Sequence, residues 1–192
     1  VVGFCRLAGV AVLGLILAAS LVGPSDPSLN FAILGVWVGW WAGFTMSTYL
    51  LVNGWPLVNP WRTLAELLPA AADRPYPERY GAWPSVVGLL SLVWIEVVTP
   101  LATRRLQLGA AIGLYTVGTL AGAWYYGVER WFGTVDPVER VFRLYGRVAP
   151  IQRGSRGVEF RLPGTALVED GTSREPGETA FVIALLWVTT YD

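Results

Sequence analysis

Long apolar stretches alternate with short polar segments along the chain. Residues 29–52 and 107–128 contain no charged side chain, and residues 1–22 contain only Arg6. A helix needs about 20 mostly apolar residues to cross the hydrocarbon core of a bilayer, so each stretch is long enough to span a membrane. A fourth apolar stretch begins near Trp83. The pattern predicts four membrane-spanning helices, over residues 1–22, 29–52, 83–100 and 106–128.

The apolar stretches at the two ends of the chain can each be interpreted in more than one way. In the first stretch, Ala18-Ala19-Ser20 is typical of a signal-peptide cleavage site, which is the alternative to a retained helix. The apolar residues before Arg6 favour the retained helix. The chain begins with Val, and its last apolar stretch is too short to cross a bilayer. We therefore expect a piece of a longer protein, with residues 180–192 as the start of a further span.

Two short amphipathic helices are expected outside the spans. Asn59 is a good N-cap and is followed by Pro60, which favours the first helical position. A helix over residues 60–68 would lie at the membrane surface, with one apolar face formed by Trp61, Leu64, Leu67 and Leu68. In the Arg-rich polar segment 129–179, an acidic N-cap with Pro and then Glu indicates a second amphipathic helix over 137–148.

A short strand is expected near residues 158–162, where apolar and charged residues alternate. The predicted fold is thus an all-α, polytopic transmembrane bundle over residues 1–128. It has about four spans, a truncated fifth, short interfacial helices and one polar cytoplasmic loop that contains a small β element.

The distribution of Arg predicts the orientation. If the spans alternate, one side receives twelve of the 14 Arg residues and the other receives Arg104 and Arg105. Because basic residues are enriched in cytoplasmic loops, the Arg-rich loops are expected in the cytoplasm of a multi-pass cell-membrane protein.

Composition narrows the possible chemistry. The chain contains no His and a single Cys, Cys5, and all 14 basic residues are Arg. These counts exclude His-based catalysis and haem ligation, a disulfide within the chain, and Schiff-base lysine chemistry. No metal site and no cofactor are therefore expected. The formal net charge of zero gives no basic field for nucleic acid.

Glycines recur in two predicted spans, mostly at four-residue spacing. Such spacing places small residues on one stripe, where helix backbones can approach closely in lipid. The stripes predict packing within the bundle, or contact with a second copy or with other membrane subunits. The glycines are Gly35, Gly39 and Gly43, and Gly109, Gly113, Gly118 and Gly122.

Two carboxylates are candidates for a functional role. Glu96 is the acidic residue inside a predicted span, where charge is costly. It suits an ion pair with nearby Arg104 or Arg105, a proton or cation site, or catalysis. Asp192 would lie near the midplane if the fifth helix continued, as a functional acid, or would be hydrated if the segment were re-entrant.

The helix over 137–148 carries basic residues away from its apolar face, at Arg140, Arg143 and Arg147. This face is either solvated or attracts anionic lipid headgroups. Hydroxyl-bearing residues in the second and fourth spans, such as Thr45 and Thr116, either hydrogen-bond within their helices or line a polar cavity.

Four strings resemble a family of bacterial and archaeal polytopic membrane proteins commonly labelled fenitrothion hydrolase. They are VNPWRTLAELL (58–68), YPERYGAWPSV (76–86), VWIEVV (93–98) and FVIALLWVTTYD (181–192). The resemblance covers most of the chain and implies a membrane-bound hydrolase of organophosphate esters. It implies roles for Asn59, Pro60, Trp61, Arg62, Glu78, Arg79, Glu96 and Asp192.

The residues themselves favour a non-catalytic component of membrane transport, permeation or assembly. The alternative is a membrane-embedded hydrolase of hydrophobic organophosphate esters, in which carboxylates bind metal and Arg62 or Arg79 holds phosphate.

Overall fold

The long apolar stretches form helices in the computed structural model, which describes residues 1–69, 74–154, 157–169 and 175–191. The structure is 76% helical. Three helices are long and apolar enough to cross a membrane, by length and composition. These are α1 (Val2–Val22), the continuous helix Phe31–Leu50, and α7 (Arg105–Tyr126).

The helix Phe31–Leu50 has an unusual middle. It comprises α2 (Phe31–Leu34), the π-helical segment η2 (Gly35–Phe44) and α3 (Thr45–Leu50). π-Helical turns are rare and frequently occur at functional sites. Two shorter apolar helices, α6 (Trp83–Val98) and α11 (Glu178–Tyr191), pack against each other beside the longer ones.

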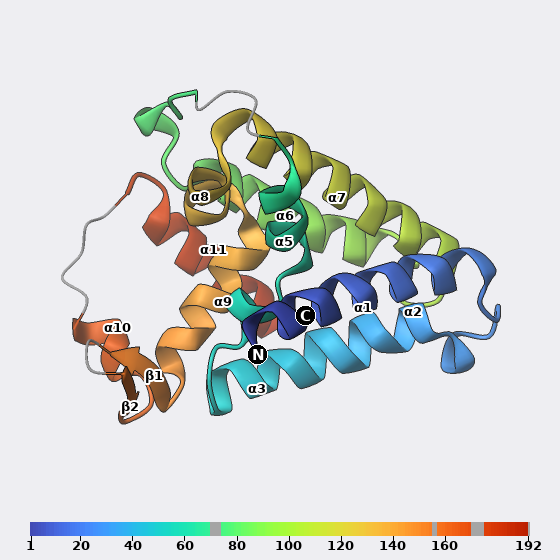
Figure 1. The fold of residues 1–192 in the computed structure, drawn as a ribbon, viewed down its shortest axis with the longest axis horizontal. Coiled ribbons are helices and arrows are strands. Elements are labelled where there is room, and N and C mark those ends of the chain that lie inside the picture. Colours follow the sequence, from blue (N-terminus) through green and yellow to red (C-terminus); the bar gives the residue numbers. More distant parts are fainter. Residues whose placement is uncertain (70–73, 155–156, 170–174, 192) are drawn as a thin grey trace.

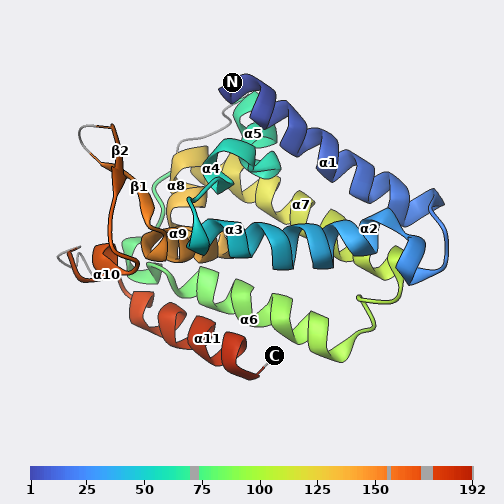
Figure 2. The same ribbon diagram turned by 90° about the horizontal axis from the view of Figure 1, so that it is seen from below.

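The apolar helices run roughly along the long dimension of the molecule, so their connections gather at two ends (Figures 1 and 2). Residues 23–30 and 99–104 lie at one end, together with Arg105 at the start of α7. The described connecting residues 51–69, 74–82, 127–154 and 157–164 lie at the other end, which we call the arginine-rich end. Among the described residues, most Arg residues thus lie at this end, while its cytoplasmic assignment stays a prediction.

All but one of the short helices described in the structure lie at the arginine-rich end. They follow the turns and caps that the sequence provides: Asn59 caps α5 by accepting a hydrogen bond from the backbone N–H of Arg62, and Asp136 caps α9 through the N–H of Glu139. The short helices are η1 (Pro27–Leu29) at the opposite end, and α4 (Trp55–Val58), α5 (Pro60–Leu67), η3 (Glu78–Tyr80), α8 (Val128–Arg130), η4 (Trp131–Val135), α9 (Pro137–Val148) and α10 (Thr165–Glu169).

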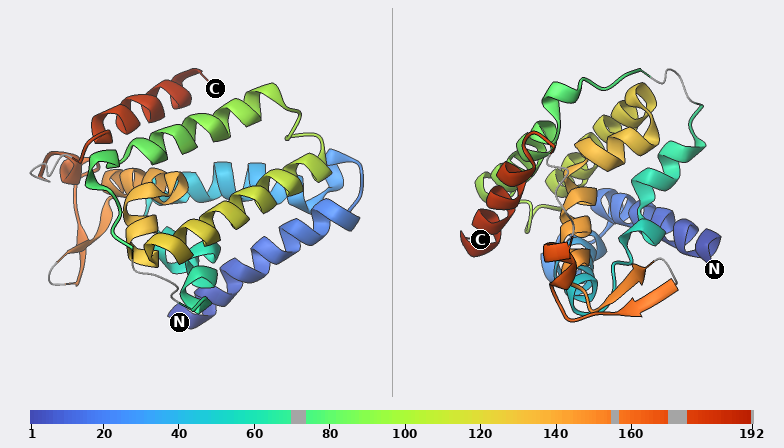
Figure 3. Two further views of the ribbon diagram at one scale, coloured as in Figure 1. Left: turned by 90° about the horizontal axis from the view of Figure 1, so that it is seen from above. Right: turned by 90° about the vertical axis from the view of Figure 1, so that its left-hand side faces the viewer.

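The small β element is a hairpin. Strands β1 (Ile151–Gly154) and β2 (Gly157–Phe160) pair antiparallel, with Ile151 opposite Phe160. The hairpin lies beyond α9 at the arginine-rich end, where a bridge between Ile151 and Val52 joins it to the end of the helix Phe31–Leu50 (Figures 2 and 3).

Helix α5 forms as predicted but packs only part of its predicted apolar face inward: Trp61 is buried and Leu64 is partly buried against the core. It packs against α1 and α7, with Trp61 and Ala65 buried. Leu67 and Leu68, expected on the same apolar face, are exposed. Trp61 and Ala65 are four residues apart and so lie on one side of the helix, and the small side chain of Ala65 allows α5 to lie close to α7.

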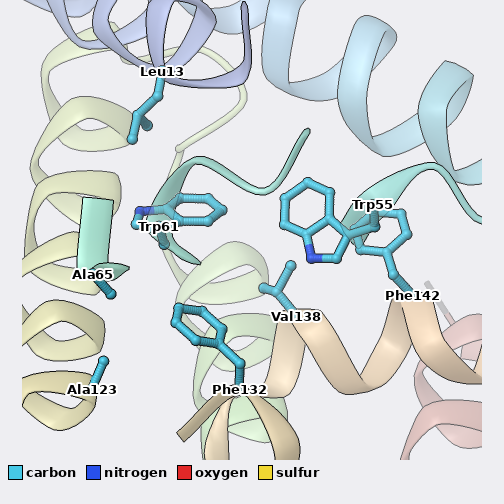
Figure 4. Close-up of a cluster of buried hydrophobic side chains, with 8 residues drawn as sticks. All are labelled: Leu13, Trp55, Trp61, Ala65, Ala123, Phe132, Val138 and Phe142. Atoms are coloured by element: carbon cyan, nitrogen blue, oxygen red, sulfur yellow. The ribbon is translucent and has the colours of Figure 1, made fainter. Parts of the chain in front are cut away.

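The largest core cluster lies where α4, α5, α7 and α9 meet (Figure 4). The Trp55 ring stacks on Phe142 with centroids 4.6 Å apart, and Trp55 and Trp61 are 6.0 Å apart. Aromatic pairs in such geometries add about 0.5–1.5 kcal/mol beyond the area they bury. The cluster therefore fixes the short helices against the long ones.

The predicted packing glycines differ in what they face. A Cβ atom at Gly109 would overlap the buried Ser20 side chain of α1, and one at Gly122 would overlap the Trp131 ring. A Cβ at Gly113 or Gly118 would meet open space. Gly9, which the sequence reading did not single out, approaches the backbone of Val58 so closely that a Cβ would overlap its carbonyl oxygen.

We expect Gly109→Ala to lower the stability of the bundle by about 1–3 kcal/mol, because the added methyl group would force Ser20 and α1 away from α7. The matched control is Gly113→Ala, one helical turn further along α7, where space is open. Thermal unfolding in detergent checks the difference. Equal melting temperatures for the two variants would contradict close α1–α7 packing at Gly109.

Candidate functional site

A buried polar cluster links the two capped helices at the arginine-rich end. We call Asn59, Tyr115, Asp136 and Glu139 the cap cluster. The Asn59 amide donates a hydrogen bond to the Glu139 carboxylate at 2.8 Å. The Tyr115 hydroxyl of α7 donates to the Asp136 carboxylate at 2.6 Å, and Asp136 also accepts from the backbone N–H of Glu139 at 2.7 Å. These bonds tie α5, α7 and α9 together.

The carboxyl group of Asp136 is unusual in its environment. Asp136 is 2% exposed. Burial raises its pKa from 3.8 to about 6, because the charged form loses hydration, while the hydrogen bonds from Glu139 N–H and Tyr115 act in the opposite direction. The Asp136 carboxyl group, with its pKa of about 6, therefore holds a proton to a higher pH than an ordinary aspartate does.

The basic residue beside the cap cluster is Arg62. Its guanidinium binds Glu66 at 3.3 Å and also forms an ion pair with Glu129 of α8. Glu66 in turn pairs with Arg6 of α1 at 2.5 Å. The guanidinium of Arg62, proposed from sequence as a phosphate ligand, is thus engaged with carboxylates that join α1, α5 and α8.

Glu78 and Arg79, which the resemblance singled out, lie exposed on η3. The Arg79 guanidinium lies 4.9 Å from the Tyr80 ring centroid and donates to the Tyr80 hydroxyl at 3.0 Å. Arg62 and Arg79 therefore bind different partners on different elements.

Glu96 is half-buried in α6, close to the end of that helix. Arg105, one of its two predicted partners, donates to the Ser20 and Leu21 carbonyl oxygens at 2.6 and 2.5 Å. These are carbonyls at the C-terminal end of α1, where a positive charge is favourable. The functional role of Glu96 stays a prediction, and Asp192 lies outside the described residues.

The basic face predicted on α9 is not the solvated face that its sequence suggests. Arg140 is buried, and it donates to the Thr134 carbonyl oxygen and pairs with Glu175 at 3.3 Å.

Arg143 donates to the carbonyl oxygens of Phe132 and Gly133, both at 2.8 Å. Burial lowers the pKa of Arg143, since the charged form loses hydration. The side chains of Arg140 and Arg143 hold the irregular segment before α9, a tertiary role that helical periodicity cannot reveal. Binding of anionic lipid headgroups by Arg140, Arg143 and Arg147 stays a prediction.

An apolar groove runs beside the cap cluster, between α1 and the helix Phe31–Leu50. Its volume is about 450 Å³. Its lining contains only aliphatic, aromatic, proline and glycine residues; we call it the tryptophan groove, after Trp40, Trp55 and Trp61. Gly35 and Gly39 of the π-helical segment form part of one wall, and Ala8, Gly9 and Val12 of α1 form part of the other.

Trp61 joins the groove to the polar groups. Its ring lines the groove, its indole N–H donates to the Thr116 hydroxyl at 2.8 Å, and it packs edge-on against Tyr115. The capping sequence signalled Asp136 and Glu139 without showing that α5 and α7 would bind them. The four-residue spacing of Gly35 and Gly39 is a local sequence signal for one wall of the groove. The other walls have no such signal, because they come from segments that meet only in the fold.

A search of the described residues for metal sites found no group of three or more Cys, Asp or Glu side chains placed to hold an ion. Comparisons of the chain with protein-family models, with curated proteins and with solved structures gave no match.

We expect Asp136 to make the protein less stable as the pH rises from about 4 to 6. The folded state, with the higher pKa of about 6, holds the proton over this range while the unfolded state, near 3.8, releases it. A shift of this size corresponds to about 3 kcal/mol. Melting temperatures in detergent between pH 4 and 7 measure the effect.

The control is Asp136→Asn, in which the amide oxygen can still accept the capping bond from Glu139 N–H. Other carboxyl groups titrate in both proteins, so the difference between the two pH profiles isolates Asp136. Parallel profiles for the wild type and the variant would show that Asp136 is not protonated in this range.

Proposed function

We propose that this chain is an integral membrane protein that acts as an assembly component, receiving a membrane-embedded helix of a partner subunit in the tryptophan groove. The proposal has two parts, a location in the bilayer and a role for the groove. Neither part assigns a chemical reaction to the chain.

The surfaces of the long helices support the location. Bulky apolar side chains point outward along them, for example Leu15 on α1, Val38 on η2 and Leu114 on α7. Water-soluble monomers rarely expose contiguous apolar patches larger than a few hundred Å². Lipid removes this cost, and the polar connections at the two ends would then lie in the headgroup layers. The cytoplasmic location of the arginine-rich end is part of the same proposal.

The tryptophan groove is the observation that carries the assembly role. Gly35 and Gly39 lie in its wall with room beside them. A Cβ at Gly39 would lie 3.9 Å from the Leu34 carbonyl oxygen, an ordinary van der Waals distance. In lipid, helices associate through close packing, which small residues at four-residue spacing allow. The groove thus offers an apolar, glycine-walled surface that a further helix can fill.

Transport through a polar cavity has less support. The hydroxyl groups of Ser47 and Thr48 donate to the Phe44 carbonyl oxygen of their own helix, and Thr116 donates to that of Ile112. These bonds stay within single helices, which is the ordinary role of such residues in apolar segments. Thr116 also accepts from Trp61 of α5, and the buried Thr45 hydroxyl has no hydrogen-bond partner among the described residues. Kinship with the family labelled fenitrothion hydrolase is a separate proposal, which rests on the four strings quoted above, and the assembly role does not depend on it.

We expect a photoreactive residue in the groove to crosslink to protein. Val36 lines the groove, so benzoylphenylalanine at this position should form an adduct with a partner helix when irradiated in native membranes. The control position is Val117, on the exposed surface of α7, which should react with lipid. Gel shift and mass spectrometry identify the adducts. Lipid adducts alone at Val36 would contradict the assembly role.

We expect Gly39→Leu to abolish the protein adduct formed from Val36, because the leucine side chain would occupy the groove. The matched variant is Gly118→Leu on α7, where a Cβ also meets open space but away from the groove. Both variants should insert into membranes like the wild type. Retention of the adduct in Gly39→Leu, or its loss in both variants, would count against the groove as the contact.

A further inference from the structure

The hairpin presents its apolar side chains to the outside. Val158, Phe160 and Leu162 are 72%, 82% and 77% exposed. Side chains two residues apart on a strand lie on the same side, so Val158 and Phe160 of β2 share one surface, opposite Arg153 and Ile151 of β1 in the register. Leu162 follows two residues beyond the strand, and we call Val158, Phe160 and Leu162 the hairpin apolar face. Between them along the chain, Glu159 and Arg161 form an ion pair at 2.9 Å and are only partly exposed. If both sides of the hairpin faced water, collecting the apolar side chains on one side would not lower the free energy of the protein.

The hairpin is attached directly to the end of a membrane-length helix. The backbone N–H of Ile151 in β1 donates to the Leu51 carbonyl oxygen at 3.1 Å, and Ile151 forms a parallel bridge with Val52. Leu51 and Val52 directly follow the helix Phe31–Leu50, and both are exposed. Exposed apolar residues therefore occur on both sides of this junction, at the end of the helix and on the hairpin.

The strand pairing sets the depth of the hairpin. Phe160 lies directly opposite Ile151, which itself neighbours Val52. Neighbouring strands are about 4.8 Å apart, so Phe160 lies about 10 Å from Val52, which is two residues beyond the end of the helix. The headgroup layer extends about 5–8 Å beyond the hydrocarbon core on each side, and interfacial elements bury their apolar face about 5–10 Å into the headgroup boundary. If the helix Phe31–Leu50 spans a bilayer, Phe160 is at the depth of this layer.

We propose that the hairpin apolar face inserts into the interfacial layer of the bilayer at the arginine-rich end. Lipid is what covers this face, because the hairpin joins the helix Phe31–Leu50 at the end where that helix would leave the hydrocarbon core. The inference rests on the membrane location proposed above and not on the role of the groove. Lipid contact stabilises the three apolar side chains that water would leave exposed, and it holds β1 beside the end of α3.

Site-directed spin labelling in bilayer nanodiscs tests this inference. The single Cys5 is first replaced by Ser, and one label is then introduced through Phe160→Cys. The matched control is Glu159→Cys, adjacent in β2 but on its opposite side. A second control is Leu114→Cys, on the exposed surface of α7. Collision of each label with oxygen, which concentrates in lipid, is compared with collision with a polar nickel chelate, which stays in water.

We expect the oxygen-to-nickel collision ratio at position 160 to exceed that at 159 several-fold and to lie below the ratio at 114, which is near the middle of α7. A water-like ratio at 160, with a lipid-like ratio at 114, overturns the hairpin inference and leaves the membrane location intact. A label at 160 that is shielded from both reagents shows a protein partner on this face and also overturns the inference. A water-like ratio at 114 overturns the membrane location and the hairpin inference together.

A second position guards against a local effect of the label. Val158→Cys lies on the same face as Phe160 and should show the same lipid-like ratio. Circular dichroism of each labelled protein, compared with the Cys5→Ser parent, verifies that the helices are retained. Disagreement between positions 158 and 160 in correctly folded protein would overturn insertion of the face as a whole.

Discussion

Lipid offers no hydrogen-bonding partner to a polypeptide backbone, and this constraint organises the proposed membrane fold. Every N–H and C=O group at membrane depth must bond within the protein, which helices achieve within one segment. The apolar stretches satisfy this requirement as α1, α7 and the helix Phe31–Leu50. Irregular backbone, the hairpin and most charged residues are left to the ends, chiefly the arginine-rich end.

At that end, polar side chains supply hydrogen-bonding partners to the helix ends, a role that water fills in many soluble proteins. Asn59 and Asp136 cap α5 and α9, and their remaining hydrogen-bonding groups bind Glu139 and Tyr115. Arg140 and Arg143 bind carbonyl oxygens of η4, which directly precedes α9. Because buried polar groups are costly unless they are paired, the cap cluster serves primarily to hold the helices in place. The apolar tryptophan groove then remains as the surface suited to a partner.

The sequence predicted the helices well because hydrophobicity and capping are local properties. Helix α9 begins and ends at the predicted residues, and β2 lies where apolar and charged residues alternate. Its partner strand β1, residues 151–154, was not predicted. The partners of Arg140 and the contact between Gly9 and Val58 were missed, since both depend on segments far apart in the chain. Spacing alone likewise could not separate Gly109, which meets α1, from Gly113, which meets open space. The glycine stripe predicted one wall of the tryptophan groove, through Gly35 and Gly39, but the groove as a whole depends on segments that meet only in the fold.

The location of the long helices in lipid is tested most directly by a carbene reagent confined to the hydrocarbon layer of native membranes. After photolysis, peptide mapping should find the label on outward side chains of the three long helices, such as Leu15, Val38 and Leu114, and not on segment 129–148. Unlabelled helices, or labelling of segment 129–148 to the same extent, would contradict a membrane-spanning fold.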